Sequence, residues 1–153
     1  MSFHDELDQL IGEAKAEYLK QLGTIKNLMG KLKGEWLPAY FGGDGKDYKF
    51  FHPIEADEKR KDDLSHVLSE KGKTFAVGLA IRAGVNFACF LRVSNVTKDK
   101  ADIKLIGSDE VYLLPGEAGI TGFCTELFEA AKKALADHGV QESTKTVTIN
   151  VYE

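Results

Sequence analysis

The stretch of residues 73–95, KTFAVGLAIRAGVNFACFLRVSN, decides the fold of the chain. Bulky and small residues alternate strictly through its first half, which is typical of a strand that buries one face. A three-residue loop, Ala83-Gly84-Val85, pairs Arg82 with Asn86 and predicts a hairpin of two strands. In that register one face carries a continuous set of large side chains, which are Phe75, Val77, Leu79, Ile81, Phe87, Cys89, Leu91 and Val93.

The opposite face of this hairpin is predicted to be shallow and basic. Its floor and rim are formed by Ala76, Gly78, Ala80, Ala88, Arg82, Asn86, Phe90, Arg92 and Ser94. Arginine is a fork-shaped donor suited to carboxylate and phosphate, and two of the three arginines of the chain lie here. Three interpretations stay open: a solvated sheet face, a contact with a subunit or partner, or a site for a small anionic ligand. A two-residue Gly84-Val85 turn would change which side chains lie on each face of the hairpin.

Two long amphipathic helices are predicted, at residues 2–33 and about 118–138, because apolar residues recur there every three or four positions. Ser2 and Asp5 suit the start of the first helix, and Gly139 suits the end of the second. A shorter, charged helix is expected at about 55–70. Further strands are expected at about 101–106, at 109–114 and in the last nine residues, KTVTINVYE.

This order of elements predicts an α+β fold. Residues 1–153 are expected to form a single two-layer domain, since their number suits one hydrophobic core. Links of hairpin length favour a mainly antiparallel sheet, with the long N-terminal helix and the C-terminal amphipathic helix packed on one face.

A glycine-rich stretch at residues 40–48, YFGGDGKDY, does not have the pattern of a phosphate-binding loop. It lacks the required glycine spacing, the hydroxyl residue after Gly-Lys and a following helix. The Asp44-Gly45 pair instead predicts a tight turn between two short aromatic strands. In that hairpin Trp36, Tyr40 and Phe51 share one face, which is either a second packing layer or an exposed aromatic patch for a partner.

No constellation of residues predicts an enzyme. The glycines of LPGEAGITGF, residues 114–123, do not follow the dinucleotide-binding pattern, so no cofactor is expected. The histidines and cysteines lack the spacings of metal ligands, and no metal is expected. His66 is expected on a solvated helix face, and no catalytic residue is predicted.

The composition argues against several partners. The formal net charge is −4 and the basic residues are scattered, so no nucleic acid is expected. No apolar run reaches the length of about 18 residues that suggests a membrane span, and the N-terminus lacks the pattern of a signal peptide. Two cysteines in apolar surroundings suit a reducing compartment, so the chain is predicted to be cytoplasmic.

The sequence therefore predicts a non-enzymatic cytoplasmic binding protein that acts through protein–protein contacts, as a homodimer. The alternative is a small anionic-ligand-binding protein, or minor enzyme, that uses Arg82, Asn86 and Arg92 of the shallow sheet face.

Overall fold

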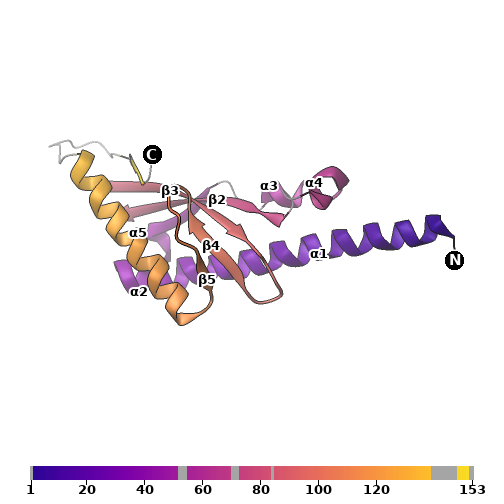
Figure 1. Ribbon diagram of the computed structural model, residues 1–153. Coiled ribbons are helices and arrows are strands. Elements are labelled where there is room, and N and C mark those ends of the chain that lie inside the picture. Colours follow the sequence, from indigo (N-terminus) through magenta and orange to yellow (C-terminus); the bar gives the residue numbers. More distant parts are fainter. Residues whose placement is uncertain (1, 52–54, 70–72, 84, 139–147, 152–153) are drawn as a thin grey trace.

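A computed structural model of the protein describes residues 2–51, 55–69, 73–83, 85–138 and 148–151. The predicted α+β architecture is confirmed. A mainly antiparallel sheet packs against a long N-terminal helix and a C-terminal helix, as Figure 1 shows.

The helical elements are α1 (Phe3–Lys31), the π-helical η1 (Leu32–Trp36), α2 (Leu37–Phe41), the short 3-10 turn η2 (Gly45–Asp47), α3 (Glu55–Glu58), α4 (Leu64–Leu68) and α5 (Glu117–His138). The predicted start of α1 is confirmed. The Ser2 hydroxyl accepts a hydrogen bond from the backbone N–H of Asp5 at 3.2 Å, and the Asp5 carboxylate accepts one from the Ser2 N–H. These bonds satisfy donors that the first turn of a helix leaves unpaired.

The strands are β1 (Tyr48–Phe51), β2 (Phe75–Ala83), β3 (Val85–Ser94), β4 (Ala101–Leu105), β5 (Tyr112–Leu114) and β6 (Thr148–Asn150). They lie in the order β1-β2-β3-β4-β5 with antiparallel pairing throughout, and β6 joins β3 in parallel. The predicted hairpin register is confirmed, because Arg82 lies opposite Asn86.

One edge of β3 is shared by two strands. Residues 91–94 of β3 pair with β4, whereas residues 86–88 pair with β6. The backbone N–H of Val151 also donates to the carbonyl oxygen of Ala88 at 2.8 Å. The last described segment of the chain thus completes the middle of the sheet.

The core lies between the sheet and the two long helices. Every bulky residue predicted on the inner face of β2 and β3 is buried, so the predicted partition of side chains is confirmed. Tyr18, Leu22 and Ile25 of α1 and Phe123 and Leu127 of α5 belong to the same buried cluster. Both helices therefore cover one face of the sheet, and we call the other side the outer face.

The predicted aromatic hairpin around residues 40–48 is wrong. Residues 32–41 continue the long helix, which ends where Gly42 and Gly43 adopt positive φ angles of 84° and 74°. Pro38 follows directly on the π-helical turn η1, where the regular α-helical hydrogen-bond pattern is already interrupted. Strand β1 therefore pairs with β2 instead of with residues 36–41.

The predicted charged helix is reduced to the short helices α3 and α4, and the placement of His66 is also corrected. His66 is only 8% exposed, and its ring meets that of Tyr18 edge-on at a centroid distance of 5.7 Å. The Tyr18 hydroxyl donates to the backbone oxygen of Asp57 at 2.8 Å. Packing on α1 therefore buries the apolar face of α4, with His66 on it.

Candidate functional site

The outer face of the sheet carries the residues that the sequence predicted there. Ala76, Gly78, Ala80 and Ala88 form a floor of small residues, and the side chains of Arg82 and Arg92 are exposed. Phe90 is 43% exposed, and Asn86 and Ser94 are partly buried. The predicted shallow face is therefore present, with both arginines at its surface.

The two arginines lie too far apart to share a small ligand. Arg82 is paired with Asn86, whereas Arg92 is paired with Ala76, six residues away from Arg82 along β2. At a rise of about 3.3 Å per residue this separation is roughly 20 Å. That both arginines act on one anionic group stays a prediction, which this separation disfavours, and each arginine is considered alone below.

A hollow of about 440 Å³ lies beside Arg82 at one end of the outer face. It is lined by Lys46, Asp47, Lys49, Phe51, Ala80, Ile81, Arg82, Asn86, Phe87 and Ala88, and we call it the basic hollow. Lys49 of β1 lies opposite Ala80, which in turn lies opposite Ala88. Strand pairing therefore brings cationic groups from β1 and β2 to one place above small residues.

The turn before β1 positions Lys46. The Asp44 carboxylate accepts a hydrogen bond from the backbone N–H of Lys46 at 2.7 Å, and the Asp47 carboxylate accepts one from the Asp44 N–H at 3.0 Å. Asp47, the one acid among the described residues that line the hollow, is thus already hydrogen-bonded within the turn. These bonds fix the chain between the helix and β1, so Lys46 comes to the rim.

The cationic groups of the basic hollow form no ion pair with any acid that the structure describes. Among the residues that the structure describes, no acid lies within ion-pair distance of Lys46, Lys49 or Arg82. By contrast, the third arginine of the chain, Arg60, forms an ion pair with Asp63 at a distance of 3.3 Å. Three cationic side chains and one carboxylate surround the hollow, which gives it a surplus of positive charge in a chain of net charge −4.

The Phe51 ring lines the hollow and contacts a second ring on the outer face. Phe51 and Phe90 meet edge-on with a centroid distance of 5.4 Å, and Phe51 covers Gly78. The predicted trio of Trp36, Tyr40 and Phe51 does not form, because the first two lie on the helical side. Trp36 packs against the core, and the Tyr40 hydroxyl lies 2.7 Å from the Thr121 hydroxyl of α5.

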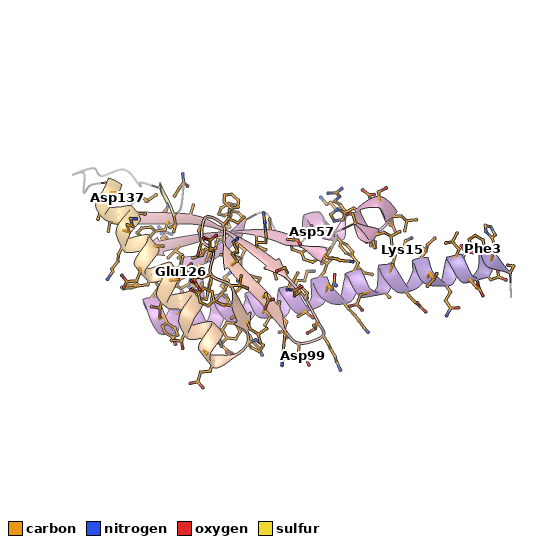
Figure 2. All side chains as sticks on the ribbon, in the orientation of Figure 1. Phe3, Lys15, Asp57, Asp99, Glu126 and Asp137 are labelled. Atoms are coloured by element: carbon orange, nitrogen blue, oxygen red, sulfur yellow. The ribbon has the colours of Figure 1, made fainter. Side chains whose placement is uncertain are left out.

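A second surface feature is the start of α1, which extends beyond the sheet (Figure 1). Phe3, Leu7 and Leu10 are 78%, 40% and 62% exposed, and the first fully buried residue of α1 is Tyr18. Figure 2 shows Phe3 at the far end of the helix, away from the sheet. We call residues 3–14 the contact helix.

The two cysteine thiols are buried, which limits their reactivity. Burial raises the pKa of both thiols, Cys89 and Cys124, to about 12, so they are not nucleophiles near neutral pH.

Within the described ranges, no group of three or more His, Cys, Asp or Glu residues is arranged to hold a metal ion. No helix in the described part of the chain has the length and apolar character needed to cross a bilayer.

Sequence reasoning found Arg82 and Asn86 of the basic hollow, but it placed Lys49 on the outward face beside Phe51 without grouping it with Arg82, and it missed Lys46. The alternation of Tyr48, Lys49 and Phe50, with both aromatics facing the core, was the available signal for an outward Lys49. Comparisons with protein-family models, with curated proteins and with solved structures give no match to the chain.

Proposed function

We propose that the protein is a non-enzymatic binding protein that acts through protein–protein contacts, and that two copies associate through the contact helix. The observation that supports this proposal is the exposed apolar stripe of Phe3, Leu7 and Leu10, on a helix that the core contacts from Ala14 onward. A half-helix without tertiary contacts is marginal in water, and a partner that buries its apolar stripe stabilises it.

The spacing of the stripe suits a helix pair. Phe3, Leu7, Leu10 and Ala14 are separated alternately by four and three residues, which is the spacing of the seam in a two-stranded coiled coil. Ala14 already packs against the core and Tyr18 is buried in it, so the seam is short and consists mainly of Phe3, Leu7 and Leu10. A short seam predicts an association that depends on protein concentration.

The residues beside the seam favour a parallel pair. In a parallel arrangement Glu6 faces Ile11 of the second copy, so no two carboxylates meet across the seam. In an antiparallel arrangement Glu6 and Glu13 flank the same side and face acids of the other copy, which is unfavourable. The proposed homodimer is therefore parallel.

Sedimentation and light scattering over a rising concentration series test the proposal. The mass of the wild-type protein is expected to rise from 16.9 kDa toward twice that value. Leu10→Glu places a charge in the seam and is expected to keep the protein monomeric. Leu19→Glu is the matched control, because Leu19 is 45% exposed but lies off the stripe. A wild-type monomer at every concentration, or equal effects of both variants, would refute the dimer.

The orientation has its own test. A cysteine introduced by Leu7→Cys lies beside its counterpart in a parallel pair, so oxidation is expected to give a linked dimer. The native thiols are buried and do not compete. If the mass doubles but oxidation gives no linked dimer, the homodimer is kept and only its parallel arrangement is contradicted. The buried, unlinked thiols also support a cytoplasmic location as part of this proposal.

A further inference from the structure

The basic hollow is separate from the contact helix, and its chemistry suggests a second activity. Its cationic groups come from three elements, with Lys46 on η2, Lys49 on β1 and Arg82 on β2, and Asn86 of β3 lies opposite Arg82. Like charges gathered on one small surface repel each other unless an anion lies between them. Within the described residues no carboxylate takes that position for these three side chains.

The donors suit a phosphate group. Arginine offers parallel N–H groups that match two oxygens of a phosphate, and lysine contributes a compact charge. A dianionic phosphate balances the surplus of about two positive charges that remains after Asp47 is counted against the three cations. A singly charged carboxylate would leave part of this charge uncompensated.

The floor and wall of the hollow are apolar. Ala80 and Ala88 are small enough to let a ligand approach the sheet, and the half-buried Phe51 ring stands at the side. The volume of about 440 Å³ lies within the range of small-molecule sites and exceeds the needs of a bare phosphate ion. A planar apolar group joined to the phosphate would fill the rest and pack against an aromatic ring.

We propose that the basic hollow binds a small organic phosphate, a phosphomonoester whose planar apolar part lies over Ala80 and Ala88 beside Phe51. Arg82 and Asn86 orient the phosphate oxygens, and Lys46 and Lys49 add charge. This proposal does not depend on the dimer, since none of these residues belongs to the contact helix.

Titration of isotope-labelled protein with phenyl phosphate, followed by amide chemical shifts, tests the proposal. Saturable shifts are expected around residues 80, 82, 86 and 88, with tighter binding than for inorganic phosphate and no saturable shift with phenol. Arg82→Gln is expected to weaken the binding of phenyl phosphate by about tenfold or more, because the substitution removes charge-assisted hydrogen bonds. Arg92→Gln is the matched control, as it removes the other outer-face arginine roughly 20 Å away.

Each other outcome overturns a defined part of the proposal. The absence of saturable shifts with phenyl phosphate would refute the site. Equal weakening by Arg82→Gln and Arg92→Gln would show a diffuse attraction to the whole outer face and would also refute it. Inorganic phosphate binding as tightly as phenyl phosphate would refute the organic part of the ligand. Both variants change exposed side chains, and an unchanged circular dichroism spectrum would verify their fold.

Discussion

The ring of Phe51 occupies the space that a side chain at Gly78 would require. The two residues lie opposite each other in β1 and β2, and a Cβ atom added to Gly78 would collide with the ring. Gly78 in turn lies opposite Phe90, whose ring meets Phe51 edge-on. The glycine therefore leaves room for the Phe51 ring beside Phe90, on a face that otherwise has only small residues at its centre.

Gly78→Ala is expected to lower the free energy of unfolding by about 1–3 kcal/mol, because Phe51 must leave its position. Urea denaturation measures this change. In a Phe51→Ala background the same substitution is expected to cost little, since the space is then empty. Equal costs in both backgrounds would show that the collision with the Phe51 ring is not the cause of the loss.

Thr24 joins α1 to the turn between β3 and β4. Its buried hydroxyl lies 2.9 Å from the carbonyl oxygen of Thr97 and 2.8 Å from that of Lys98. Thr24→Val leaves these carbonyls without the donor and is expected to cost about 1–3 kcal/mol of stability in urea denaturation. Thr24→Ser keeps the hydroxyl and is expected to lose less. A Thr24→Val protein as stable as Thr24→Ser would contradict this role.

His66 is a buried polar side chain for which no hydrogen-bond partner is found within the described part of the chain. His66→Phe keeps the edge-on contact with Tyr18 and removes the buried ring nitrogens. The substitution is expected to raise the free energy of unfolding by about 1 kcal/mol, seen as a higher melting temperature. His66→Gln, which keeps polar atoms there, is expected to give no gain. A lower melting temperature for His66→Phe would mean that the nitrogens make stabilising contacts.

The protein is expected to lose stability at alkaline pH. Burial raises the pKa of Cys89 and Cys124 from 9.0 to about 12, so between these values the folded state retains protons that the unfolded state releases. Stability that is fully present below pH 9 therefore falls as the pH rises toward 12. Burial also raises the pKa of Tyr18 and Tyr48 to about 12, which acts in the same direction.

Urea midpoints measured at pH values on both sides of 9 test this expectation. A variant with both Cys89→Ala and Cys124→Ala is expected to show a shallower alkaline decline, although it is less stable at neutral pH because of the methyl-sized cavities. An identical pH slope for this variant and the wild type would show that the thiols do not contribute.

The hairpin of β2 and β3 could be predicted because every position agreed with one register. The alternation of Phe75, Val77 and Leu79 with smaller residues leaves only one face that can be buried. The long helices were predicted for the same reason, as their apolar residues repeat with the period of a helix. A local pattern of this kind is enough to predict a helix or a strand when no contact with a distant residue favours another structure.

The segment at residues 32–41 shows where this reasoning fails. Its glycine, proline and aromatic residues have low helix propensity and favoured a strand in the sequence analysis. Packing decides otherwise, because the Phe41 ring lies 5.4 Å from that of Phe128 on α5 and Leu37 is fully buried. Contacts between residues so far apart in the chain leave no local signal.

The basic hollow was predicted in part for a related reason. Arg82 and Asn86 are neighbours across a hairpin, so their pairing follows from a short loop. Lys49 reaches the hollow only because β1 pairs with β2 across the segment that contains α3 and α4. The choice of strand partner is a property of the whole fold, which a reading of neighbouring residues does not reveal.

The three residues of β6 also protect the molecule from unwanted assembly. Without them the backbone of residues 86–88 would offer unpaired N–H and C=O groups to any extended peptide, including the same strand of another molecule. A fragment ending before residue 148 would therefore carry an open sheet edge beside buried apolar side chains such as Phe87, and such edges template aggregation.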